Sequence, residues 1–240
     1  QWPWPRTRLA ELVSNLWKNG AAVVVFDVIF IEPDRTSPSE ISKDWKNEFG
    51  PDVVISGLPS NVWNFDSLFA ESLRGGASVL GCYLNLSDTP PADFPENEKS
   101  FYRGIFFEKG QSHHAWLPQA ESSLQPVQEL AKAAKGIAFI NTVPGADNII
   151  RNTPLVFAYG PGRIYPSLAL EAIRLYAGAK KVGIIYDMSG AEGIQHIQVR
   201  DGIIPTDSHG RLAVNYRSTR IPHWSVADVL NGRLPPGAVK

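Results

Sequence analysis

Residues 21–30 read AAVVVFDVIF, an apolar and largely β-branched run on which the fold prediction depends. A strand that leaves one face in water alternates apolar and polar residues, whereas this run is almost continuous, so we expect a central strand covered on both faces. Before it, apolar residues recur at helical spacing from Leu9 to Trp17, and Asn19-Gly20 is a typical helix stop. The sequence therefore begins with an amphipathic helix followed by a buried strand.

Helical and strand-like segments alternate along the rest of the chain. The helices are predicted over 66–74 with Asp66 as the cap, over 126–135, over 166–177 and, after a capping box at Ser225, over about 225–231. The further strands are predicted over 53–55, 77–86, 137–141, 149–150, 155–159, 182–186, 194–199 and 212–216. The predicted fold class is α/β: a mixed, mostly parallel sheet covered by helices on both faces, with antiparallel strands toward the C-terminal half.

Length and composition indicate one globular domain. The 240 residues are 43% hydrophobic and 20% charged, which is ordinary for a chain that buries a core. We therefore expect a single domain over residues 1–240. Residues 87–123 contain scattered proline and aromatic residues without periodicity, and we interpret them as an insertion or a long surface loop.

Charge and hydropathy restrict the possible partners. The 23 basic and 24 acidic residues give a net charge of -1 without a long block of one sign, so nucleic acid is not an expected partner. No uncharged stretch approaches the roughly 20 apolar residues that a membrane-spanning helix needs. The sequence has no initiator Met and no signal peptide, so we expect both ends to be boundaries within a longer protein.

Asp27 lies within the apolar run and is the first candidate site residue. A buried carboxylate is costly unless a cation or several donors meet it, and Arg35 or Arg151 is a candidate partner. One interpretation is a buried structural ion pair. The other is a pocket for a ligand or cation at the carboxyl end of the strand. The candidate ligand-binding residues are Asp27, Glu32, Asp34, Arg35 and Arg151.

Motifs for catalysis or metal binding are weak. Adjacent His113 and His114 rarely point the same way, and the single cysteine, Cys82, lies in an apolar strand, so we predict no metal site, no catalytic residue and no cofactor. A hydrolase with a carboxylate pair, such as Asp27 with Glu32 or Asp147, stays open because the separation of two carboxylates is a three-dimensional property.

Several landmarks follow one another along the sequence. Residues 20–30 are followed by Glu-Pro-Asp-Arg-Thr-Ser-Pro at 32–38, and Arg-Asn-Thr-Pro-Leu occurs at 151–155. Residues 165–172 contain a P-S-L-A segment, and residues 207–217 read D-x-x-G-x-x-x-x-N-Y-R. Together and in this order, the landmarks resemble the CHASE2 domain, the second type of the CHASE extracytoplasmic sensory domains.

The resemblance implies a non-catalytic sensor domain of a bacterial transmembrane receptor, outside the cytoplasmic membrane and connected to it only through flanking helices. The output implied is an adenylate or guanylate cyclase, a histidine kinase or a Ser/Thr kinase, and the segment at 32–38 favours a class III cyclase. The resemblance also implies a closing strand after Lys240, so the sheet here is expected to lack that strand.

Two functions stay open for such a domain, ligand sensing and receptor assembly. We expect an unknown small-molecule or protein ligand and a homodimer; the alternative is an assembly module that dimerises receptors without a small ligand. Tryptophans are typical of such contacts, although they are more often core residues, and the candidates are Trp2, Trp4, Trp17 and Trp224.

Overall fold

The strand β2 (Ser78–Leu86) is the centre of the largest sheet. The computed structural model describes residues 4–87, 101–111, 114–145, 147–187, 193–217 and 221–239. The first half of β2 pairs in parallel with β1 (Val24–Phe26) and with β5 (Gly136–Phe139), and its second half pairs antiparallel with β4 (Gln119–Leu124). The sheet continues from β4 through β7 (Val156–Tyr159) to β8 (Ile164–Pro166).

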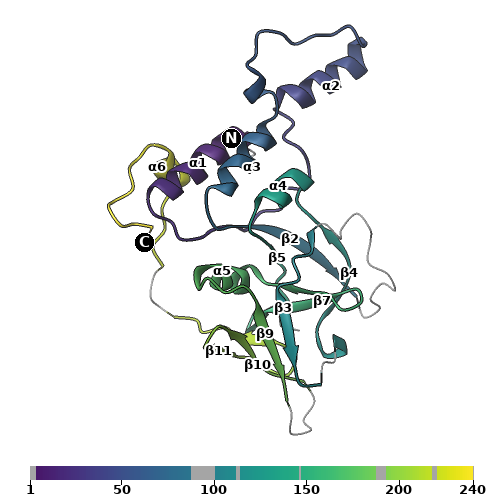
Figure 1. Cartoon of the computed structure of the whole chain (residues 1–240), viewed down its shortest axis with the longest axis vertical. Coiled ribbons are helices and arrows are strands. Elements are labelled where there is room, and N and C mark those ends of the chain that lie inside the picture. The colour runs from purple at the N-terminus through teal and green to yellow at the C-terminus, as the bar shows by residue number, and fades with distance from the viewer. Residues whose placement is uncertain are drawn as a thin grey trace.

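Two smaller sheets complete the β structure (Figure 1). The four-stranded sheet has the order β11-β10-β9-β3 and contains β3 (Phe106–Lys109), β9 (Val182–Tyr186), β10 (Ile194–Val199) and β11 (Gly202–Pro205). The two-stranded sheet pairs β6 (Asn152–Pro154) with β12 (Arg211–Ala213). Parallel and antiparallel pairs both occur, so the predicted mixed α/β class is confirmed.

Helices pack on both sides of β1 and β2. Leu12 of α1 (Arg6–Lys18) and Phe69 of α3 (Phe65–Arg74) share one buried cluster with Phe26 and Leu80. On the other side, α5 (Leu168–Tyr176) contacts β1, β2 and β5. The remaining helices are α2 (Pro38–Phe49), α4 (Gln128–Ala133), α6 (Val226–Leu230) and the short 3₁₀ turns η1 (Ser60–Val62) and η3 (His114–Trp116).

The prediction that residues 21–30 form a covered central strand is wrong. Only Val24–Phe26 are in the sheet, as its edge strand, and the side chain of Val25 is 38% exposed. The apolar run has a different cause: Phe30, beyond the strand, packs edge to face against Phe26 and Phe69, with ring centroids 5.4–5.6 Å apart. The aromatic cluster under α3 accounts for the continuous hydrophobicity, and β2 is the strand covered on both faces.

The outer edge of β1 borders an open apolar hollow of about 530 Å³. Alternate β1 residues face opposite sides, so Phe26 joins the core under α1 whereas Val25 faces the hollow. The hollow is also lined by Leu16, Ile173 and the largely exposed Tyr176. The edge of β1 is therefore free of a further strand among the residues that the structure describes.

Other local predictions are partly corrected. Residues 106–109 and 119–124 form β3 and β4 inside the segment interpreted as an insertion or a loop, and residues 53–55 are not a strand. Helix α3 is capped by the side chain of Asn64, not by Asp66. The predicted cap Ser225 does accept a hydrogen bond from the Asp228 N–H at the start of α6.

A buried ion pair anchors α5. Nε and Nη2 of the Arg174 guanidinium each donate to the Glu171 carboxylate at 2.7 Å. The third nitrogen, Nη1, donates to the Ala179 carbonyl at 2.7 Å. Burial raises the pKa of Glu171, although Arg174 opposes the shift. The side chains of Glu171 and Arg174 are 1% and 9% exposed. This pair fixes the last turn of α5 to the chain that enters β9.

Candidate functional site

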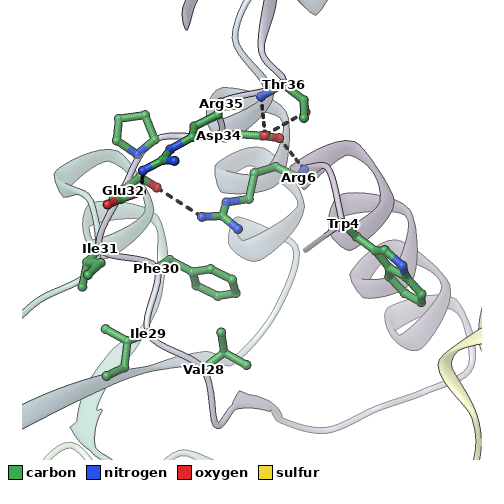
Figure 2. Close-up of a pocket in the computed structure, with 11 residues that line it drawn as sticks. Trp4, Arg6, Val28, Ile29, Phe30, Ile31, Glu32, Asp34, Arg35 and Thr36 are labelled. Carbon is green, nitrogen blue, oxygen red and sulfur yellow. Dashed lines mark hydrogen bonds and ion pairs between the residues drawn. The ribbon is translucent and has the colours of Figure 1, made fainter. Parts of the chain in front are cut away.

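A pocket of about 510 Å³ lies where the chain leaves β1 (Figure 2). It is lined by Trp4 and Arg6 at the N-terminal end of α1 and by the segment 28–36. Of the five candidate site residues, Glu32, Asp34 and Arg35 line this pocket, and Asp27 and Arg151 do not. The sequence prediction therefore placed three of its five residues in one hollow.

Local interactions hold the segment 28–36 in place. The Phe30 carbonyl accepts a hydrogen bond of 2.7 Å from the Val127 N–H, and the Phe30 side chain is buried in the aromatic cluster. Asp34 Oδ1 accepts hydrogen bonds from the N–H and the hydroxyl of Thr36, which closes a tight turn. The wall of the pocket is thus an anchored loop.

Arg6 connects this loop to two helices. Its backbone N–H donates to Asp34 Oδ2 at 2.6 Å, its Nε donates to Asp66 Oδ1 at 3.1 Å, and its Nη2 donates to the Glu32 carbonyl at 3.2 Å. The guanidinium carbon lies 4.4 Å from the centroid of the Phe30 ring, a cation–π contact. Figure 2 shows Arg6 between the loop and the start of α1. One side chain therefore joins α1, the pocket wall and α3.

The centre of this network contains two carboxylates and one guanidinium. Asp66 Oδ2 also accepts the Asp34 N–H at 2.8 Å, and Asp34 and Asp66 are both buried. Burial raises the pKa of Asp66, while the hydrogen bond from Asp34 and the charge of Arg6 oppose the rise. Because one cation faces two acids, removal of Arg6 leaves an unbalanced buried negative charge.

The rim of the pocket carries an exposed ion pair. Arg35 Nη2 lies 2.6 Å from Glu32 Oε2, and the two side chains are 80% and 58% exposed. Such a pair contributes little to stability, so both groups are free to exchange their partner for a ligand at low cost. The floor below them is apolar, with Val28, Ile29 and Phe30. This combination of an apolar floor and a polar rim is typical of a small-molecule site.

Asp27 does not have the environment predicted for it. It is exposed, Arg35 pairs with Glu32, and Arg151 pairs with Asp147, so neither predicted partner meets it. The interpretation as a buried ion pair is wrong, and so is a pocket centred on Asp27. The physical reason is that β1 ends at Phe26 on the sheet edge, where the next residue reaches water.

We expect the charge reversal Asp27→Lys to be nearly neutral. An exposed residue that makes no hydrogen bond or ion pair with the described residues contributes within about 0.5 kcal/mol to stability. Urea unfolding of the variant should give the midpoint and slope of the wild type. A loss above about 2 kcal/mol would show that Asp27 has a structural role that its exposure hides.

Arg151 lies in an exposed ion pair of its own, with Nη2 2.7 Å from Asp147 Oδ2. The hydrogen bond with Arg151 lowers the pKa of Asp147 and raises that of Arg151. The Arg151 carbonyl accepts a bond from Val214 after β12. This residue therefore belongs to the region around the two-stranded sheet.

Two residues that hold the pocket loop, Arg6 and Asp66, are not among the predicted site residues. Arg6 precedes the first apolar position of α1, and Asp66 was interpreted only as a helix cap. The available signal was their position: a charged residue at the first turn of each helix that packs beside the apolar run. Nothing in their spacing along the chain indicates that the two meet.

Among the described residues, no cluster of three His, Cys, Asp or Glu side chains that could hold a metal ion occurs. His113 lies outside the described residues. His114 Nε2 lies 3.0 Å from Glu108 Oε1, which also accepts a hydrogen bond of 2.6 Å from the Tyr186 hydroxyl. The contacts of His114 thus join η3 to β3 and β9.

The comparison with protein families gives a match over the whole chain. A family model described as the CHASE2 domain matches residues 1–240. The chain belongs to the CHASE2 domain family. CHASE2 domains are extracellular or periplasmic sensory domains of signalling receptors. No curated protein and no solved structure matches this CHASE2 chain. Across the described ranges, none of its helices has the length and apolarity needed to cross a bilayer.

Proposed function

We propose that this chain is the periplasmic sensor domain of a bacterial inner-membrane receptor whose output is a class III adenylate or guanylate cyclase. The observation that carries the proposal is the CHASE2 match over residues 1–240. The Glu-Pro-Asp-Arg-Thr-Ser-Pro segment at 32–38 favours a cyclase over a histidine or Ser/Thr kinase. The single-domain organisation and the closing strand after Lys240 stay predictions.

The pocket beside α1 supports a ligand-sensing function. Its wall is the segment 28–36, and Arg6 bonds that wall directly to the first turn of α1. At its other end α1 packs against α6, where Asn15 Nδ2 donates to the Val229 carbonyl at 3.4 Å. A ligand that binds one position of the wall better than another would therefore shift α1 and the contact between α1 and α6. Flanking membrane helices would receive this shift.

We expect a ligand at this pocket to raise the thermal unfolding temperature of the chain. Differential scanning fluorimetry would measure the unfolding temperature in the presence of amino acids, dicarboxylates, amines, nucleotides and sugars. A ligand that binds only the folded state stabilises it by mass action. Arg35→Gln should abolish the shift for a true ligand of the rim. Arg151→Gln is the matched control, because it removes an equally exposed ion pair away from the pocket.

The same variants test the receptor. In the intact protein in membrane vesicles, the compound should change cyclic nucleotide formation, and Arg35→Gln should remove the response without lowering the basal rate. A thermal shift that Arg35→Gln leaves intact would contradict the pocket as the site. A receptor that contains no cyclase would contradict the proposed output and leave the sensor function standing.

A second function, dimerisation without a small ligand, is favoured by one specific observation. Helix α2 exposes large apolar side chains, with Trp45 47% and Phe49 68% exposed. Failure of every compound to shift the unfolding temperature, together with a stable dimer, would favour this assembly function over ligand sensing.

A further inference from the structure

Helix α2 stands away from the body of the domain (Figure 1). Among the described elements it makes no extensive contact with another helix or strand, and Ser42 is its one buried residue. The arm of residues 38–63 is closed at its base, where the Ser39 N–H donates to the Trp63 carbonyl and the Phe65 N–H donates to Ser37 Oγ. The arm is thus attached at its base and unsupported at its helix.

One face of α2 is apolar. Ile41, Trp45 and Phe49 are spaced by four residues and form a stripe along the helix. A 12-residue helix gains little stability in water by itself, and in proteins its stability comes mainly from packing of the apolar face. Val54 and Leu58 on the return segment are 78% and 44% exposed, so the arm does not cover its own stripe.

The charges beside the stripe indicate what covers it. At 100° per residue, Asp44 and Glu48 lie on one flank of the stripe and Lys46 lies on the other, whereas Glu40 and Lys43 lie toward the opposite face of the helix and pair with each other. When two copies of a helix pack through one seam, a parallel pair brings opposite flanks together, whereas an antiparallel pair brings like flanks together. In a parallel pair the acidic flank of each copy therefore meets the basic flank of the other.

We propose that α2 is the dimer contact of this chain and that it pairs in parallel with α2 of a second copy through the stripe Ile41, Trp45 and Phe49. The inference rests on the dimerisation proposed above as the second function, and it names the surface through which the two copies meet. The other candidate tryptophans do not supply one: Trp17 donates to the Ser72 carbonyl, Trp4 lines the pocket, and Trp2 lies outside the described residues. Trp224 is 45% exposed but has no comparable apolar stripe on α6.

The arm joins the body at the pocket network. The Asp34 N–H donates to Asp66 Oδ2 across the two segments that enter and leave the arm, and both residues contact Arg6. The arm that carries the dimer contact and the pocket wall are therefore attached to the domain at the same place. This arrangement gives ligand occupancy a direct route to dimer geometry.

Sedimentation equilibrium of the 240-residue chain tests the contact. One helix pair buries less than a standard interface of about 1,600 Å², so we expect a weak dimer with a Kd on the order of 10 µM. The double variant Trp45→Ser/Phe49→Ser should weaken it at least about tenfold. The control Ile203→Ser removes an apolar side chain that is 64% exposed on β11 and should leave the dimer unchanged.

Folding and orientation are checked separately. Because α2 makes no extensive contact with another described element, Trp45→Ser/Phe49→Ser should keep the thermal unfolding temperature of the monomer. Lys46→Glu should weaken the dimer, and the addition of Glu48→Lys should restore it. Ile41→Cys should form a disulfide between copies under mild oxidation, since residue 41 faces residue 41 only in a parallel pair. The native Cys82 is buried, so the wild-type chain should form little disulfide between copies under the same conditions.

Three results would overturn the inference. They are a monomeric chain at concentrations about a hundredfold above the expected Kd, a dimer that survives loss of both aromatic residues, and a dimer in which Ile41→Cys does not crosslink. Each of these leaves the sensor function intact, because ligand binding at the pocket is measured independently by the thermal shift and its loss in Arg35→Gln.

Discussion

Replacing Arg6 by methionine is expected to destabilise the domain by about 3–5 kcal/mol, the range for a buried charge that loses its partner. The Arg6 side chain is 13% exposed, and its removal leaves the buried carboxylate of Asp66 without its cation. It also removes the hydrogen bond to the Glu32 carbonyl and the contact with Phe30. Urea unfolding at neutral pH, monitored by tryptophan fluorescence, measures the loss.

Arg8→Met is the control for Arg6→Met. Arg8 lies in the same helix and pairs with Glu11, but the two side chains are 61% and 44% exposed, so the expected loss is below about 1 kcal/mol. Equal losses in the two variants would contradict the importance of the buried network.

The loss in Arg6→Met should become smaller in acid. Burial raises the pKa of Asp66 above its usual 3.8, so the folded state binds this proton more tightly than the unfolded state. Stability contributed by this carboxyl is therefore greatest below 3.8 and is lost as pH rises through the raised pKa. Without Arg6 the pKa rises further, and protonation relieves the unpaired charge. The difference between variant and wild type should narrow as pH falls from neutral toward that window.

Replacing Arg174 by methionine is expected to cost a similar amount, about 3–5 kcal/mol. Glu171 is 1% exposed, and Arg174 is the residue that donates to both of its oxygens. The Ala179 carbonyl also loses its donor. Thermal and urea unfolding should show the loss without a change in the slope of the urea transition, because the surface exposed on unfolding is unchanged.

The double variant Glu171→Leu/Arg174→Met tests whether the loss in Arg174→Met comes from the unpaired charge of Glu171 or from lost packing of the Arg174 side chain. With both charges gone, the loss should be clearly smaller than in Arg174→Met alone. Arg211→Met is the exposed control, since the side chains of Arg211 and Asp207 are 43% and 35% exposed. A double variant as unstable as the single one would show that the packing of the Arg174 side chain, and not its charge, holds α5.

The fold class followed from periodicity, whereas the position of the first strand did not. Helix α5 and strand β9 lie where their patterns predicted them, because each buries a face that the spacing of its own residues defines. In the run at 21–30, Val24, Phe26 and Phe30 are buried in the cluster with α1 and α3. The composition of the run does not reveal whether sheet or helix provides the cover. Periodicity reports burial but not the neighbour responsible for it.

Helix α2 is not among the helices predicted from the sequence, because Pro33 and Pro38 are residues that usually interrupt regular structure. Pro38 is the first residue of the helix, a position where its missing N–H is not needed, so the same residue that ends one element begins another. Strands β3 and β4 were missed because their residues are largely exposed or partly buried and carry no alternating pattern.

The site was predictable only where it is local in sequence. Glu32, Asp34 and Arg35 lie within one four-residue stretch after β1, and all three line the same pocket. Arg6 and Asp66 reach the same place from 28 and 32 residues away from Asp34, and this contact depends on how α1 and α3 pack. Asp27 was misplaced because its burial was inferred from its neighbours in the sequence.

No described strand pairs with the outer edge of β1, and this has a practical consequence for handling the protein. A strand edge with unpaired N–H and C=O groups between apolar side chains is a template for any extended peptide, including the same edge of another molecule. Concentrated samples should therefore form β-rich aggregates on storage. A short Val-rich peptide, or a lysine in place of Val25, should keep such samples clear.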